Sequence, residues 1–175
     1  VYEARLVRQT AKAMKVATQM GNQGSAGSGL RRAVEIIQAG VIGAPRELHV
    51  WSNRPIWPQA INRPTAAHNV PETMDWDLWL GPAAARPFSP AYAPFNWRGW
   101  QDYSNGQLGD FGCHILDPVF MALELTAPTS IKAEAPKINQ ESWTKAATVA
   151  YEFPGTKHTA GSNIRVTWYD GDGVT

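Results

Sequence analysis

The sequence has only one cysteine, Cys113, among its 175 residues, and its charges nearly cancel, with 16 lysine and arginine residues against 15 aspartate and glutamate residues. A single thiol excludes an internal disulfide and leaves the redox compartment open. The formal net charge of +1 indicates no nucleic-acid partner and no membrane partner through bulk electrostatics. No apolar run is long enough to span a bilayer, and the first residues carry no signal-peptide pattern. The compartment, cytoplasmic or exported, stays open.

Tryptophan, in contrast, is abundant, with eight residues in the chain, most of them between positions 51 and 100. Because tryptophan combines a large apolar body with one donor, the cluster suits either an aromatic core, the commoner explanation, or a sugar-stacking surface. Residues 55–100 are rich in proline and show little regular pattern except a short helix near residues 75–80. We interpret this stretch as an ordered segment that lines a site or a subunit contact.

The remaining pattern predicts an α+β domain. Apolar periodicity and turn residues predict helices, and alternating or short apolar runs predict strands. The expected helices are 1–14, 30–39 and 109–125, and the expected strands are 15–20, 46–54, 130–135, 144–153 and 163–168. This order predicts an open mixed or antiparallel sheet that helices cover on one face. The chain opens inside a helical pattern and closes just after a strand begins to turn, so we expect a piece of a longer protein.

A glycine-rich turn at residues 21–29 follows the first expected strand. Its glycines are arranged as G-x-x-G followed by a Gly/Ser run, and not as the G-x-G-x-x-G that opens a helix in dinucleotide-binding proteins. The turn is therefore a weak candidate for a phosphate cradle. The run Gly-Ser-Ala-Gly-Ser-Gly resembles a flexible linker, either natural or engineered.

The segment from Gly106 to Asp117 contains the pattern D-x-x-x-H. If Gly106 and Gly109 form a turn, Asp110 lies in the first turn of the following helix, where the helix dipole favours a carboxylate. His114 and Asp117 then project from the same face. An imidazole between two carboxylates would exchange protons near neutral pH. The alternative is an N-cap aspartate with a hydrogen-bonded, partly buried histidine.

A metal site is not predicted. Asp110 and His114 could share an ion, but no third ligand occurs at a recognisable spacing. His49 is expected on a sheet face, and His68 and His158 are expected to be ordinary surface residues.

Six segments resemble, in the same order along the chain, the glucose–fructose oxidoreductase, inositol dehydrogenase and rhizopine-catabolism (Gfo/Idh/MocA) oxidoreductases. They include the last strand of the nucleotide domain, the helix and glycine turn that open the second domain, two Trp-rich motifs typical of a bacterial branch, and the D-x-x-x-H segment. Together they cover most of residues 14–125. The segments are 16–23, 29–32, 38–43, 76–82, 96–100 and 109–117.

The resemblance implies an enzyme with two domains. Residues 1–24 would be the end of a Rossmann domain, and residues 25–175 an α/β substrate and oligomerisation domain that is cut short at its C-terminal end. In such enzymes NAD or NADP exchanges a hydride with a carbinol carbon of a sugar or polyol, and the open sheet often forms the contact of a homo-oligomer. The family's dinucleotide loop and its Glu-Lys-Pro lysine are missing here, so we expect no turnover by this chain alone.

The resemblance also implies roles for individual residues. His114 would be the acid/base, and Asp110 its partner or a ligand of a substrate hydroxyl. A base is needed because the alcohol loses its hydroxyl proton as the hydride leaves its carbon. Asn22 and Gln23, at the end of the first expected strand, would lie near the cofactor. Candidates for sugar contacts, each equally compatible with packing or surface roles, are Asn53, Arg54, Trp97, Arg98 and Trp100.

Two other functions stay open. Some members of the superfamily use transient oxidation to cleave glycosidic bonds, and the aromatic stretch would suit a larger glycoside. Alternatively, the chain is a non-catalytic module in which the sheet mediates assembly and the D-x-x-x-H pattern is structural.

Overall fold

The four strands form one mixed sheet in the order β1-β4-β3-β2. The parallel pair β1–β4 lies at one edge, and β3 pairs antiparallel with both β4 and β2. The computed structural model describes residues 2–21 and 23–171. Its elements are α1 (Tyr2–Met14), η1 (Gln23–Ala26), α2 (Ser28–Gln38), β1 (Glu47–Ser52), α3 (Trp76–Leu80), η2 (Asn96–Gly99), α4 (Gly106–Ile115), α5 (Asp117–Leu123), β2 (Ser130–Glu134), β3 (Ala146–Pro154) and β4 (Asn163–Gly171).

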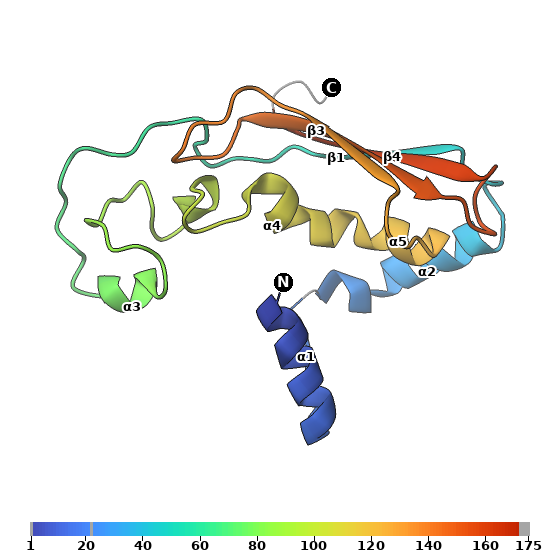
Figure 1. The fold of residues 1–175 in the computed structure, drawn as a ribbon, viewed down its shortest axis with the longest axis horizontal. Helices are drawn as coiled ribbons and strands as arrows, with labels where there is room; N and C mark the ends of the chain where they lie inside the picture. The colour runs from blue at the N-terminus through green and yellow to red at the C-terminus, as the bar shows by residue number, and fades with distance from the viewer. Residues whose placement is uncertain (1, 22, 172–175) are drawn as a thin grey trace.

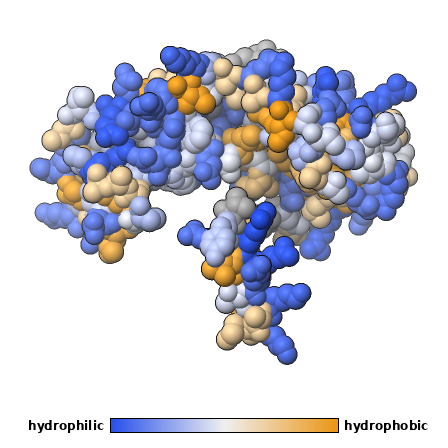
Figure 2. All heavy atoms as spheres, viewed as in Figure 1, coloured by the Kyte–Doolittle hydropathy of each residue, from blue (hydrophilic) through white to orange (hydrophobic). Residues whose placement is uncertain are grey.

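Helices α2, α4 and α5 lie along one face of the sheet, and no helix of the described residues covers the other face (Figure 1). This arrangement confirms the predicted α+β class with an open, mixed sheet. Helix α1 projects away from the rest of the chain (Figure 1) and has no buried residue. Polar and apolar side chains both appear on the surface of α1 (Figure 2).

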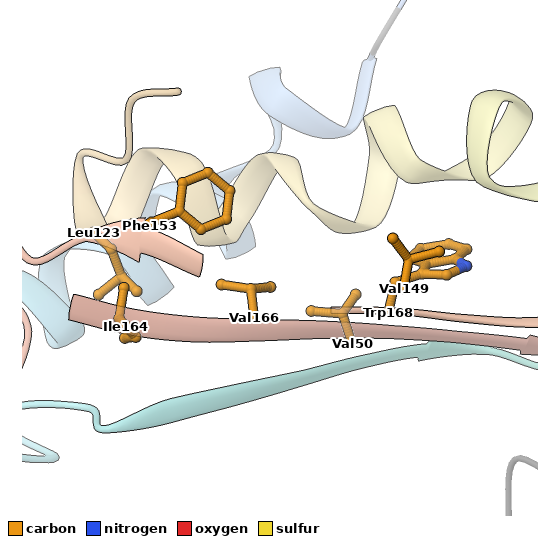
Figure 3. Packing of buried hydrophobic residues seen from close by; sticks show 7 residues of the cluster. All are labelled: Val50, Leu123, Val149, Phe153, Ile164, Val166 and Trp168. Atoms are coloured by element: carbon orange, nitrogen blue, oxygen red, sulfur yellow. The ribbon is translucent and has the colours of Figure 1, made fainter. Parts of the chain in front are cut away.

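The core lies between the sheet and these helices (Figure 3). Alternate residues of β4 point toward the helices, because successive side chains of a strand face opposite sides. Val166 and Trp168 are fully buried there, and Leu123 of α5 belongs to the same core cluster, beside Ile164 (Figure 3). The indole Nε1 of Trp168 donates a hydrogen bond of 2.8 Å to Asp170, so the largest core side chain keeps its polar atom paired.

The strand predicted at residues 15–20 is wrong. These residues follow α1 without regular structure, and Val16 and Met20 are 57% and 74% exposed. A short apolar run needs a neighbouring strand to pair with, and none of the described strands lies beside it. Lys15, with a positive φ of 54°, ends α1 instead of lying in a buried strand.

The helix predicted at 109–125 is present as two helices that meet at Leu116. Helix α4 begins at Gly106, three residues earlier than predicted, so Gly109 lies inside the helix and marks no turn. The expectation that Asp110 lies in the first turn is therefore wrong. Pro118 occupies the start of α5, where a missing N–H is tolerated.

Candidate functional site

The end of β1 is fixed against α4 by a buried polar contact. Gln107 is 4% exposed, and its Nε2 donates to the hydroxyl of Ser52 over 3.2 Å. The same hydroxyl accepts the backbone N–H of Arg54 at 3.1 Å. The chain therefore leaves β1 in a set direction, and residues 53 and 54 follow directly beside the helix that carries the D-x-x-x-H pattern.

Two arginines converge on one indole ring. The Arg54 guanidinium lies 5.7 Å from the Phe111 ring of α4 and 6.0 Å from the ring of Trp57. The Arg98 guanidinium lies 5.6 Å from the same Trp57 ring. Cations are attracted to the faces of aromatic rings at such distances. Trp57 is itself buried, and its Nε1 donates to Gln59 over 2.9 Å, which holds the ring in place.

Arg98 is held on several sides. Its Nε lies 3.6 Å from the Asp110 carboxylate, and its Nη1 donates to the backbone carbonyl of Phe95 over 3.2 Å. Its guanidinium also lies 4.4 Å from the Trp97 ring. The neighbouring Gly99 permits this placement, because a Cβ there would lie 2.3 Å from the carbonyl oxygen of Pro58.

His114 lies on the exposed side of α4, and its ring meets the Phe111 ring edge to face at 5.8 Å. In the described part of the chain it forms no hydrogen bond or ion pair with Asp110 or Asp117. Asp110 pairs with Arg98, and Asp117 accepts a hydrogen bond from the hydroxyl of Ser25. The expected imidazole between two carboxylates is therefore not formed in this structure.

The structure brings four of the predicted site residues into one neighbourhood, connected by the contacts of Phe111 and Trp57: Arg54, Arg98, Asp110 and His114. Trp97 adjoins them through Arg98, and Asn53 is exposed just before Arg54.

The other predicted residues are placed differently. Trp100 is 0% exposed and donates its Nε1 to the carbonyl of Ala91, so it packs inside the protein and offers no surface to a sugar here. Gln23 is exposed at the start of η1, and none of the described strands precedes it, contrary to expectation. Asn22 lies outside the described residues. His158 is no ordinary surface residue: its side chain is 12% exposed and lies 3.4 Å from Glu124.

Sequence reasoning missed Trp57, Phe111 and Gln107. Phe111 and Gln107 occur within the D-x-x-x-H segment, at one and three residues from Asp110. The position of Phe111 and Gln107 within this segment could have marked them as site residues. The residues that they hold in place, however, lie far away in the sequence. Trp57 stands in the Trp-rich stretch, and no local pattern distinguishes it from the packed tryptophans there.

The glycine-rich turn does not have the strand–turn–helix form of a dinucleotide loop in the described residues. Residues 15–21 before it are irregular, and η1 stands between them and α2. A phosphate-binding glycine loop joins a strand to the N-terminus of a helix. Among the described residues no three His, Cys, Asp or Glu side chains are grouped to hold a metal ion. In that same part of the chain no helix has the length and apolar character to cross a membrane.

Two comparisons with known proteins bear on this site. The model of the C-terminal alpha/beta domain of the Gfo/Idh/MocA oxidoreductase family matches residues 27–164. The search among curated proteins gives no match. The matched segment contains every element from α2 to β3 and all of the arginine, aspartate and histidine residues gathered around α4. Since the match covers well over half of the sequence, the chain belongs to the Gfo/Idh/MocA oxidoreductase family.

Proposed function

We propose that this chain is part of an NAD(P)-dependent oxidoreductase that transfers a hydride between nicotinamide and a hydroxyl-bearing carbon of a sugar or polyol. The observation that carries the proposal is the placement of His114 on α4, exposed and without a hydrogen-bond partner in the described residues. It shares this helix with Asp110 and meets the Phe111 ring, which Arg54 also contacts. Family membership supports the oxidoreductase class. The polar groups around α4 support a hydroxylated substrate.

His114 is the proposed acid/base. A hydroxyl group loses its proton as its carbon is oxidised, and a histidine titrates in the range where it can accept that proton. The imidazole of His114 has no acceptor or donor in the described structure that a substrate hydroxyl would need to displace. The Phe111 ring beside it limits one side of the imidazole.

Asp110 is proposed to bind a substrate hydroxyl and not to hold the imidazole. Its carboxylate faces Arg98 at 3.6 Å. A carboxylate accepts several hydrogen bonds at once, so Asp110 can keep the ion pair and still accept from a hydroxyl. Arg98 and Arg54 would then donate to neighbouring oxygens of the same substrate.

Members of this family are generally NAD(P)-dependent. Because no described strand leads into the glycine-rich turn before α2, we propose that the cofactor, NAD or NADP, is bound by another part of the protein. Only the binding of substrate and the movement of the hydroxyl proton are assigned to this chain. We also propose that the open face of the sheet forms the contact of a homo-oligomer.

The test is turnover by the intact protein that carries this chain. A panel of sugars and polyols is supplied with NAD and with NADP, and wild type is compared with His114→Ala. The variant is expected to lose roughly 10²–10⁴-fold in kcat, the usual contribution of a general base. His68→Ala is the matched control, because His68 is exposed in the irregular stretch before α3. An unchanged rate for His114→Ala, or no reaction with any member of the panel, would favour the non-catalytic alternative.

A further inference from the structure

An open cleft of about 440 Å³ lies beside α3 and η2, next to the candidate site. Its volume falls within the range of about 300–1,000 Å³ typical of small-molecule sites. Exposed hydrophobic side chains also appear at the surface over α3 (Figure 2). The residues that line the cleft are Trp79, Leu80, Pro82, Ala83, Trp97, Asp102 and Tyr103.

The two tryptophans of the cleft differ from the packed ones. Five of the eight indoles donate their N–H to an oxygen of the protein: Trp57, Trp76, Trp100, Trp143 and Trp168. Trp79 and Trp97 have no such acceptor within residues 2–21 and 23–171, both are only partly buried, and both line the cleft. Part of each indole is therefore available to a ligand, in contrast to the packed indoles.

The ring of Tyr103 forms part of the cleft wall. Its hydroxyl oxygen is inaccessible to water and has no hydrogen-bond partner in the described structure, so a ligand in the cleft meets the ring and not the hydroxyl. Tyr103 meets the Trp79 ring edge to face at 5.1 Å, so the phenol and the indole form one wall.

Asp102 supplies an acceptor. Its Oδ2 pairs with Arg86, whose guanidinium lies 5.3 Å from the rings of both Tyr92 and Tyr103. The Arg86 side chain is only 6% exposed, whereas that of Asp102 is 45% exposed. The buried Arg86 guanidinium thus fixes one oxygen of the Asp102 carboxylate. The other oxygen, Oδ1, has no partner among the described residues.

We propose that this cleft binds a neutral pyranose ring, as a subsite for a second sugar unit of the substrate. A pyranose has apolar C–H faces that pack on aromatic rings and hydroxyls that both donate and accept. The cleft matches it with the rings of Trp79, Trp97 and Tyr103 and with the Asp102 carboxylate, which accepts hydrogen bonds. The Trp79 ring stacks on Trp76 at 4.8 Å, which fixes its orientation.

The cleft and the site around α4 are neighbours, because two consecutive residues connect them. Trp97 lines the cleft, and its neighbour Arg98 pairs with Asp110. The inference rests on the proposed function to this extent: the sugar unit that reacts lies near His114, and the unit next to it occupies the cleft. The carboxylate disfavours an anionic sugar, so the occupant is uncharged.

The test measures binding and turnover separately in the intact protein. Calorimetric titrations with maltose, cellobiose and lactose are compared with glucose and galactose for wild type, Ala83→Trp and Trp79→Ala. At least one disaccharide is expected to bind more tightly than its monosaccharide. Ala83 lines the cleft, so Ala83→Trp should fill it and weaken that disaccharide roughly tenfold or more. Trp79→Ala should weaken it roughly tenfold. Monosaccharide binding should not change.

Tyr2→Ala is the control, because Tyr2 is an aromatic residue of α1 that is 76% exposed and does not line the cleft. Ala83→Trp leaves every ring of the cleft wall in place, so a folding defect in Trp79→Ala leaves a second variant. The proposal is overturned if no disaccharide of the panel binds, or if Ala83→Trp binds the disaccharide as wild type does. These results do not depend on His114→Ala, so failure of the subsite and failure of the catalytic assignment are distinguishable.

Discussion

The Nε atom of Arg98 lies 3.6 Å from the carboxylate of Asp110, and this ion pair joins η2 to α4. Both side chains are about three-quarters buried, with 27% and 23% exposed. Through the pair, the Trp-rich stretch is connected to the helix that carries the D-x-x-x-H pattern. Arg98 also contacts the rings of Phe95 and Trp97, so the position of Asp110 depends on the packing of this stretch.

A double-mutant cycle on Arg98→Ala and Asp110→Ala measures the pair directly. Because the pair is not fully buried, we expect a coupling in the free energy of unfolding of no more than about 1 kcal/mol. The effect on turnover should be larger, since each variant removes a proposed substrate ligand and should raise KM. Urea denaturation and steady-state kinetics give the two quantities. A large coupling in stability with unchanged KM would instead assign the pair to the fold alone.

The sequence predicted the sheet and its helices well, because β3, β4 and α2 have regular apolar patterns that tertiary contacts reinforce. It failed at residues 15–20, where an apolar run without a pairing strand stays irregular. The prediction that Asp110 lies in the first helical turn failed because the start of α4 at Gly106 depends on packing. A Cβ on Gly106 would lie 2.9 Å from the ring of Trp143.

The candidate site was only partly predictable for the same reason. His114 and Asp110 belong to one local motif, which a reader of the sequence can find. The pairing of Asp110 with Arg98, and the shared contact of Arg54 and Arg98 with Trp57, join segments far apart in the chain. No local periodicity encodes such contacts.

Gly171 is expected to be intolerant of any side chain. Its φ is +77°, and a Cβ would lie 1.9 Å from the carbonyl oxygen of Lys145. Gly171→Ala should therefore destabilise the protein by at least about 2 kcal/mol through clash and backbone strain. Gly40→Ala, where φ is +74° but the space is open, should cost about 1–2 kcal/mol. Gly24→Ala, with open space and no positive φ, should change stability by less than about 0.5 kcal/mol. Chemical denaturation of the three variants checks this order.

Truncation of the core should be costly where the helices meet the sheet. Ile164 of β4 and Leu123 of α5 are each 1% exposed. Replacement of either by alanine is expected to lower the free energy of unfolding by about 2–5 kcal/mol, from lost burial and the cavity left behind. Ile131 of edge strand β2 is 60% exposed, and Ile131→Ala should cost less than about 1 kcal/mol. Equal losses at the three positions would contradict the placement of the core.

The phenol of Tyr103 should lose its proton at a higher pH than an exposed tyrosine does. Burial, assisted by the charge that Tyr92 would carry, raises the pKa of Tyr103 from 10.0 to about 12, although Arg86 and Arg63 oppose the rise. Between these values the unfolded chain loses the phenol proton and the folded chain keeps it. Stability should therefore fall as pH rises from about 10 to 12, and this contribution is intact below pH 10. Subtraction of the Tyr103→Phe profile from that of wild type isolates the effect. A difference profile that is flat over this range would show that the phenol is not held in its protonated form.

The open face of the sheet is expected to mediate self-association. Trp51 of β1 is 61% exposed on that face and lies opposite Tyr169 of β4. An exposed aromatic on a strand that has a free edge in the described sheet favours contact with a second copy. Trp51→Glu would place two carboxylates against each other across a two-fold contact, so sedimentation velocity should show a shift toward monomer. Val41→Glu is the matched control, because Val41 is 72% exposed in the turn after α2 and not on the sheet. If both variants sediment as wild type does, the contact lies elsewhere and the sheet face is not the interface.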